Sequence, residues 1–190
     1  MLKSKSLLFI VFSLTLFIQC SKENKFSIEK GRVGALTNES SIGDLNIVFE
    51  NDSIVSHLNN KDSDTDNNMF TSGNDEYIIY SKNGDKLLEI SAETPNDPTS
   101  KIKSIQIFNS NYKTNEGISL KSTFKDINEH YLINKVEATL TSATLFIDEL
   151  DATISIDKKD LGLNIFSREE ISIEQIPDNA KIKYLIIWFN

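Results

Sequence analysis

The sequence predicts an α+β fold in which one or more antiparallel sheets pack against two short helices, with the chain built from two duplicated half-domains of about 80 residues. Three observations lead to this prediction. Apolar and polar residues alternate over many short segments, as in strands with one covered face. Two segments carry a helix-capping pattern followed by an apolar stripe. Finally, two blocks of sequence recur in the same order at nearly the same spacing.

The duplication rests on two pairs of segments. Residues 36–49 align with residues 118–131 at an offset of 82, and residues 101–108 align with residues 181–188 at an offset of 80. Chance similarity between amphipathic segments is the alternative, but two blocks in one order favour duplication. A long period with two copies indicates two related halves rather than a solenoid. We expect these halves to cover about 31–110 and 113–190.

Each copy of the first block predicts a short helix. Ser41 and Asp44, like Thr123 and Asp126, have the spacing of a capping box, in which hydroxyl and carboxylate satisfy free backbone N–H groups. The residues that follow form one apolar stripe in each helix: Ile42, Leu45 and Phe49, then Phe124, Ile127 and Tyr131. Asp44 and Asp126 could instead form a carboxylate pair brought together by pseudo-symmetry. Capping is the preferred interpretation, because the spacing already explains both residues.

The remaining regular segments are predicted to be strands. The clearest hairpin joins residues 77–80 to 86–90 through Asn83-Gly84, a pair that suits a type I′ turn. The other expected strands are 101–108, 136–141, 143–147, 152–156 and 181–189. The last of these is continuously apolar from Leu185 to Phe189, which predicts a central strand buried on both faces.

The beginning of the chain has the pattern of a bacterial lipoprotein signal. Lys3 and Lys5 precede the apolar run Leu7–Ile18, which as a helix would rise roughly 18 Å and fall short of a bilayer core of about 30 Å. Cys20 follows, and it is the only cysteine. A buried filler or a spare thiol is the alternative reading of a lone cysteine.

We therefore expect a signal peptide over 1–19, lipidation at Cys20, a tether over 20–28 and a single domain over 29–190. Lipidation predicts a location in the bacterial cell envelope. Ser21 stands where an aspartate would favour retention at the inner membrane, so the outer membrane is expected.

The charge of the chain argues against nucleic acid as a partner. The net charge is −8, and loss of residues 1–19 would remove two lysines and no acid. An acidic surface without a block of Lys and Arg repels phosphate backbones and anionic headgroups. Membrane attachment must then come from the lipid on Cys20.

One acidic loop is a weak candidate for a metal site. Asp62, Asp64 and Asp66 have the spacing that opens a calcium loop. A full EF-hand loop would carry Gly and Glu where this chain has Asn67 and Gly73. A solvated acidic loop is therefore the preferred interpretation, and no cofactor is expected.

No segment predicts an enzyme. Only His57 and His130 could act as bases near neutral pH, and no hydrolase, nucleotide-binding or zinc-protease motif accompanies them. The leading hypothesis is a non-enzymatic, lipid-anchored protein that binds another envelope component, a protein or a glycan. The alternative is a small-molecule or metal-ion binding lipoprotein, and an unrecognised hydrolase ranks third.

Three stretches resemble the bacterial outer-membrane lipoproteins regulated by the envelope stress sigma factor, a family of undefined function. The first is Gly31-Arg-Val-Gly34-Ala-Leu36, and the second runs from Ile102 through Gly117 to Asp126 and Ile127. The third is the terminal Lys181-Ile-Lys-Tyr-Leu-Ile-Ile-Trp188. The resemblance implies an envelope location and a duplicated α+β domain, and it supplies no catalytic residue.

The acidic loop gives the first testable prediction. Replacing residues 59–75 with a Gly-Ser linker should leave the melting temperature nearly unchanged, because a polar, acidic segment contributes little packing. Millimolar calcium should likewise leave the melting temperature of the intact protein unchanged. A calcium-dependent rise that Asp64→Ala abolishes would contradict this prediction, since a ligand bound only by the native state stabilises it.

Overall fold

The computed structural model describes residues 25–58, 75–164 and 170–189. The expected signal peptide, Cys20 and the candidate ligands Asp62, Asp64 and Asp66 lie outside these residues. No helix within the described ranges is both long and apolar enough to cross a membrane.

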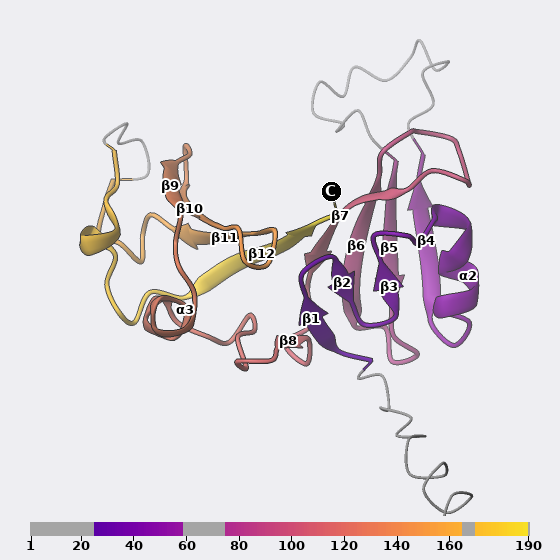
Figure 1. The fold of residues 1–190 in the computed structure, drawn as a ribbon, viewed down its shortest axis with the longest axis horizontal. Coiled ribbons are helices and arrows are strands. Elements are labelled where there is room, and N and C mark those ends of the chain that lie inside the picture. Colours follow the sequence, from indigo (N-terminus) through magenta and orange to yellow (C-terminus); the bar gives the residue numbers. More distant parts are fainter. Residues whose placement is uncertain (1–24, 59–74, 165–169, 190) are drawn as a thin grey trace, which may run out of the picture.

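The fold is mixed α+β, as predicted, and its main element is an eight-stranded antiparallel sheet (Figure 1). The strands run in the spatial order β4-β5-β6-β7-β12-β11-β10-β9. Their bounds are β4 Ser53–His57, β5 Glu76–Tyr80, β6 Lys86–Ala92, β7 Ile102–Ile107, β9 Lys135–Ala138, β10 Ser142–Ile147, β11 Ala152–Asp157 and β12 Ile182–Trp188. The first and second halves of the chain thus supply four neighbouring strands each.

The final strand β12 joins these two groups of strands. Its Leu185 lies opposite Ile107 of β7, and Ile187 lies opposite Ile105. On its other side β12 pairs with β11. The prediction that the final strand lies in the middle of the sheet is therefore confirmed.

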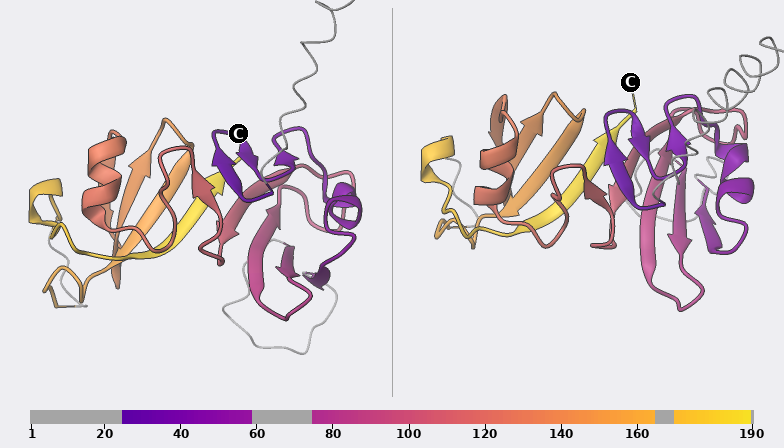
Figure 2. Two further views of the ribbon diagram at one scale, coloured as in Figure 1. Left: turned by 90° about the horizontal axis from the view of Figure 1, so that it is seen from below. Right: turned by 60° about the horizontal axis from the view of Figure 1, so that its bottom comes forward.

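A row of paired apolar residues crosses the sheet on one face. It consists of Ile79, Leu88, Ile107, Leu185, Ile154 and Leu145, each at most 1% exposed. Paired residues of antiparallel strands point to the same face, so this row marks the covered face. The two helices and a smaller sheet lie over this face of the large sheet (Figure 2).

The opposite face of the sheet, which we call the open face, is less covered. The next row of paired residues there is Ile78, Glu89, Gln106, Ile186, Thr153 and Phe146. Ile186 and Trp188 are half-buried, whereas Leu185, Ile187 and Phe189 are buried. The expectation that Leu185–Phe189 is buried on both faces is therefore wrong, because the helices cover only one of them.

The smaller sheet contains four short strands in the order β3-β2-β1-β8. Their bounds are β1 Ser27–Glu29, β2 Arg32–Val33, β3 Leu36–Thr37 and β8 Lys113–Thr114. β1 pairs with β8 in parallel, so the start of the folded chain attaches to its midpoint. Since Ser27 and Ile28 are buried in this sheet, the tether expected over 20–28 ends before Ser27.

Gly34 in the small sheet occupies a position that requires glycine. Its φ is +59°, and a Cβ there would lie 2.5 Å from the carbonyl oxygen of Lys25. A side chain would therefore be strained and would clash with backbone. The absence of a side chain lets the turn close against Lys25.

The two predicted helices are present and short. The first begins as the 3₁₀ helix η2, Ile42–Asp44, and continues as α2, Leu45–Val48. The second is α3, Phe124–His130, and a further 3₁₀ turn, η3, covers Ile173–Gln175. All six residues of the two expected stripes are buried: Ile42, Leu45, Phe49, Phe124, Ile127 and Tyr131.

One end of the expected acidic loop belongs to the core. Asp75 is fully buried, and its carboxylate accepts the N–H of Asn96 at 2.5 Å. The predicted dispensable segment therefore ends before Asp75, because a buried acid with a bonded partner cannot be replaced without cost.

The position of β12 yields the second prediction. Deleting residues 181–190 removes the strand that pairs with both β7 and β11, so the whole domain should unfold rather than the second half alone. Amide hydrogen exchange measures this, and deletion of Asn190 alone is the control because it leaves β12 whole. Native-like protection across residues 77–108 in the truncated protein would show two independent halves.

Candidate functional site

The four residues predicted to cap the helices form two capping boxes. Asp44 Oδ2 accepts the N–H of Ser41 at 2.8 Å and its hydroxyl at 2.8 Å. Asp126 Oδ2 accepts the N–H of Thr123 at 2.7 Å, while the Asp126 N–H donates to the Thr123 hydroxyl at 3.4 Å. Each carboxylate thus accepts hydrogen bonds from the residue that caps its own helix.

The same carboxylates do not form a pair. Asp44 begins the η2–α2 helix and Asp126 begins α3, and these helices lie at opposite ends of the molecule's long axis (Figure 1). The alternative of a shared acid–base pair is therefore wrong.

Hydrogen bonding lowers the pKa of both carboxyl groups. For Asp44 the largest contribution is the N–H of Ser41, followed by the Ser41 hydroxyl. For Asp126 the corresponding donors are the N–H and hydroxyl of Thr123. Donors aimed at a carboxylate favour its charged form, which accounts for the direction.

The loops that precede β7 and β12 form hydrogen bonds with the first residues of the two helices. Ile42 N donates to Ser100 O at 2.9 Å, and Gly43 N donates to Pro98 O at 2.8 Å. In the second half, Phe124 N donates to Ala180 O at 2.8 Å. The neighbouring Lys125 N donates to Asp178 O at 3.0 Å. These bonds satisfy N–H groups that a helix start would otherwise leave free.

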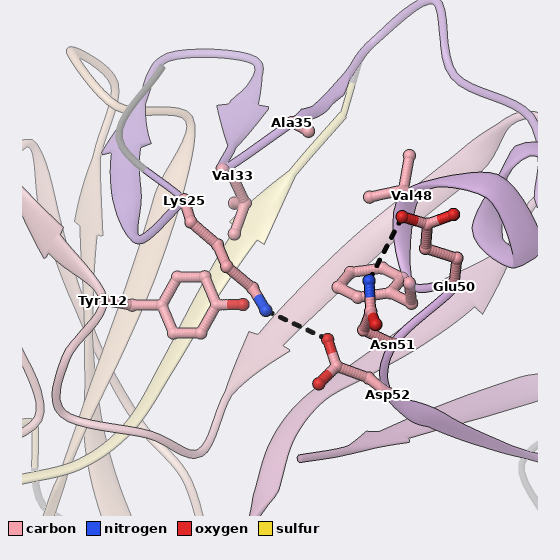
Figure 3. Close-up of a pocket in the computed structure, with 10 residues that line it drawn as sticks. Lys25, Val33, Ala35, Val48, Glu50, Asn51, Asp52 and Tyr112 are labelled. Atoms are coloured by element: carbon pink, nitrogen blue, oxygen red, sulfur yellow. Dashed lines mark hydrogen bonds and ion pairs between the residues drawn. The ribbon is translucent and has the colours of Figure 1, made fainter. Parts of the chain in front are cut away.

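A pocket beside Lys25, which we call the Lys25 pocket, has a volume of about 220 Å³ (Figure 3). Lys25 Nζ forms an ion pair with Asp52 Oδ2 at 3.1 Å. Tyr112 lies beneath this pair, 1% exposed, with its ring edge-on to Phe26 at 5.0 Å between centroids. Burial raises the pKa of Tyr112, and the Asp52 charge adds to the effect. The hydroxyl therefore stays protonated and can donate a hydrogen bond at physiological pH.

A second pocket, which we call the Tyr131 pocket, has a volume of about 370 Å³ and lies between the β1–β2 turn and the second half of the chain. The Tyr131 hydroxyl donates to the Glu116 carboxylate. Burial, then this bond, raises the pKa of Tyr131 to about 12, and the bond lowers the pKa of Glu116. Lys30 forms an ion pair with Asp151 at 3.1 Å and donates to the carbonyl oxygen of Asp148 at 3.0 Å.

A third, smaller hollow of about 180 Å³ lies beside Trp188. Trp188 Nε1 donates to Thr153 Oγ1 at 3.1 Å. Phe146 and Asp151 also line this hollow.

Neither histidine lines any of these three pockets. His57 ends β4 and is exposed. His130 ends α3, is exposed, and its Nδ1 lies 2.9 Å from the carbonyl oxygen of Asp126. Within residues 25–58, 75–164 and 170–189, no three His, Cys, Asp or Glu residues gather closely enough to hold a metal ion.

The sequence alone does not reveal the Lys25 pocket. Lys25 lies in the segment predicted to be a tether, and Tyr112 stands in a polar segment between two strands. The one available signal is Tyr112 itself, a large aromatic residue among Asn, Ser and Lys. Such a residue usually packs against something, but the sequence did not show what.

Comparisons with known proteins identify a fold and no family. No family model and no curated protein matches the chain. Among solved structures, the crystal structure of the uncharacterized protein YfeY from Escherichia coli is similar, with a TM-score of 0.51 and 13% identity. The match covers 87% of this chain and 99% of that chain, so nearly the whole fold is shared.

The capping boxes yield the third prediction. Thr123→Ala, like Ser41→Ala, should lower the free energy of unfolding by about 0.5–2 kcal/mol in urea denaturation, because each loses the hydroxyl of its box. Thr123→Ser is the control, since it keeps the hydroxyl. A loss of stability in Thr123→Ser equal to that in Thr123→Ala would show that the hydroxyl is not responsible.

The lowered pKa of Asp126 adds a pH dependence to this prediction. A carboxyl whose pKa is lower in the folded state stabilises that state above its unfolded pKa of about 3.9, and this contribution disappears as pH falls through the lowered value. The difference in stability between the wild type and Asp126→Asn should therefore shrink below about pH 4. A difference that stays constant from neutral to acidic pH would contradict the assignment.

Proposed function

We propose that this protein is a non-enzymatic component of the bacterial cell envelope, anchored through lipidated Cys20, most simply to the outer membrane, and that it binds another envelope component. The observation that carries the proposal is the position of the first folded residues. The first strand, β1, begins at Ser27, a short way along the chain from Cys20. An extended chain spans at most about 3.6 Å per residue, so β1 would begin within roughly 25 Å of an anchor at Cys20.

The same proposal includes an origin by duplication of a half-domain. The strand pairing at the centre of the sheet supports it. Leu185 pairs with Ile107, and Ile187 pairs with Ile105. At the offset of 80 residues, Ile105 corresponds to Leu185 and Ile107 corresponds to Ile187. Exchanging the two copies therefore turns each of these pairs into the other. Two copies of one unit related by a twofold axis near Gln106 and Ile186 would have this register.

Matching turns before the two helices also support duplication. Thr37 N donates to Ser40 Oγ at 3.0 Å, and 82 residues later Ser119 N donates to Ser122 Oγ at 3.1 Å. The bridge between Ser41 and Lys101 has its counterpart between Thr123 and Lys181. Since backbone hydrogen bonds recur with the sequence offset, chance similarity of amphipathic segments is a poorer account.

The open face of the large sheet is the surface we propose for the partner. Tyr184, Ile186 and Trp188 of β12 lie in its middle, and Tyr184 is 41% exposed. Phe146 lies on the same face through its pairing with Thr153. Half-exposed aromatic side chains gathered on one face are typical of surfaces that contact proteins or glycans.

The arrangement of charged groups supports a non-enzymatic function. Asp44, Asp126 and Asp157, whose pKa is lowered, accept hydrogen bonds within caps and turns or form ion pairs. Glu116, whose pKa is also lowered, accepts the hydroxyl of Tyr131. Their perturbed pKa values thus have structural causes, which is the common alternative to catalysis.

Binding of a small molecule is the second candidate function. The Lys25 pocket favours it, because a nearly buried tyrosine hydroxyl and an ion pair meet there beside apolar side chains. Metal binding would depend on Asp62, Asp64 and Asp66, which lie outside the described residues.

Anchoring gives the fourth prediction. Radioactive palmitate should label the wild-type protein, and Cys20→Ala should abolish the label and leave a longer precursor, because the thiol is the attachment point. The control is Ser21→Ala, which should label normally. Label that persists in Cys20→Ala would overturn the anchoring part of the proposal.

The partner surface is tested in the intact envelope. A photo-crosslinking residue at Tyr184 should capture an envelope component, whereas the same residue at Glu129, exposed on α3, should capture little. Co-sedimentation with isolated peptidoglycan would distinguish a glycan partner from a protein. Equal capture at both positions would remove the open face as the binding surface.

A further inference from the structure

The Lys25 pocket presents the hydroxyl of a nearly buried tyrosine on one wall. Tyr112 is almost completely buried, and its side chain points into the pocket where Lys25 and Asp52 lie (Figure 3). Its hydroxyl has no hydrogen-bond partner among the described residues, and no fully buried side-chain N or O atom there lacks a partner, so the hydroxyl is open to the pocket. It can therefore donate a hydrogen bond to a ligand.

The ion pair at the pocket offers both signs of charge. Lys25 Nζ contacts one oxygen of Asp52 at 3.1 Å, and an ammonium group has three donors. The Lys25 side chain is 55% exposed and the Asp52 side chain 7% exposed. Lys25 can therefore turn toward a ligand at little cost, whereas Asp52 remains at the pocket and needs a cationic partner.

The remaining walls are apolar. Val33, Val48 and Phe49 line the pocket together with the backbone of Gly34 and Ala35. A cavity of about 150 Å³ holds benzene, so a volume of about 220 Å³ takes a ligand of roughly nine non-hydrogen atoms.

We propose that the Lys25 pocket binds a small zwitterion, an α-amino acid with an apolar side chain. Its carboxylate would accept hydrogen bonds from the Lys25 ammonium and the Tyr112 hydroxyl, and its ammonium group would donate to Asp52. The apolar side chain would pack against Val33 and Phe49. A free carboxylic acid would leave Asp52 without a cationic partner, and a free amine would compete with Lys25, so a ligand with both charges fits best.

The Tyr131 pocket also has a tyrosine hydroxyl and a lysine nearby, but each already has a carboxylate partner. Positions 33, 34 and 49 of the Lys25 pocket correspond, 82 residues later, to Asn115, Glu116 and Tyr131. There Glu116 stands where the Lys25 pocket has Gly34, and it accepts the hydroxyl of Tyr131, which corresponds to Phe49 and not to Tyr112. Lys30 is likewise held by Asp151. The Tyr131 pocket thus provides a matched control, a tyrosine hydroxyl that is already engaged by a carboxylate.

This inference rests on the second candidate function, binding of a small molecule in the Lys25 pocket, and does not depend on the anchor at Cys20. The test is isothermal titration calorimetry on the full chain in detergent, with leucine, 4-methylpentanoate and 3-methylbutylamine as probes. Leucine should bind at least about tenfold more tightly than either analogue, because each analogue loses one charged contact. Absence of leucine binding at millimolar concentration, or equal binding of leucine and 4-methylpentanoate, would overturn the proposal.

Three variants locate the site. Tyr112→Phe, Lys25→Met and Asp52→Asn should each weaken leucine binding about tenfold, as expected for loss of a charge-assisted hydrogen bond. Tyr131→Phe, the matched control, should bind leucine like the wild type. Circular dichroism confirms that each variant is folded, and Tyr112→Phe keeps the ring that packs on Phe26. Unchanged binding in a folded Tyr112→Phe together with Asp52→Asn would move the ligand elsewhere and overturn the assignment.

Discussion

The pairing of β7 with β12 is the interaction on which the rest of the structure depends. Through it, two groups of four strands become one sheet, and the buried row on the covered face runs unbroken from Ile79 to Leu145. Both helices and the small sheet pack over that shared face. Without this pairing, β7 and β12 would each become an edge strand, and an edge strand leaves backbone N–H and C=O groups unpaired.

Local patterns predicted the parts of the fold that local chemistry determines. The capping spacing of Thr123 and Asp126 located a helix, and alternation located most strands of the large sheet. The prediction failed at Ile186 and Trp188, since a run of apolar residues does not show which of its faces another layer covers. It also missed β4, an edge strand of the large sheet, and the four strands of the small sheet. The small-sheet strands β1, β2, β3 and β8 are two or three residues long and too short for a periodic pattern.

The Lys25 pocket was unpredictable for a different reason. Lys25 and Tyr112 are far apart in sequence, and they meet because β1 pairs with β8 in parallel. The N–H of Lys113 donates to the carbonyl oxygen of Phe26 at 2.9 Å, which places Tyr112 against Phe26 and beneath Lys25. Neither residue belongs to a motif, so only the tertiary arrangement reveals their relation.

The parallel pairing of β1 with β8 also sets an order for folding. A ribosome makes the chain from its N-terminus, and the β1–β2 hairpin can form as soon as its residues emerge. Its edge at Ser27 and Ile28 has no partner until Lys113 and Thr114 follow. The first strand to be synthesised, β1, therefore cannot complete its pairing until the middle of the chain has been made. Contacts between residues so far apart in sequence form slowly. During that interval the side chain of Ile28, which is buried in the folded protein, stays exposed to solvent.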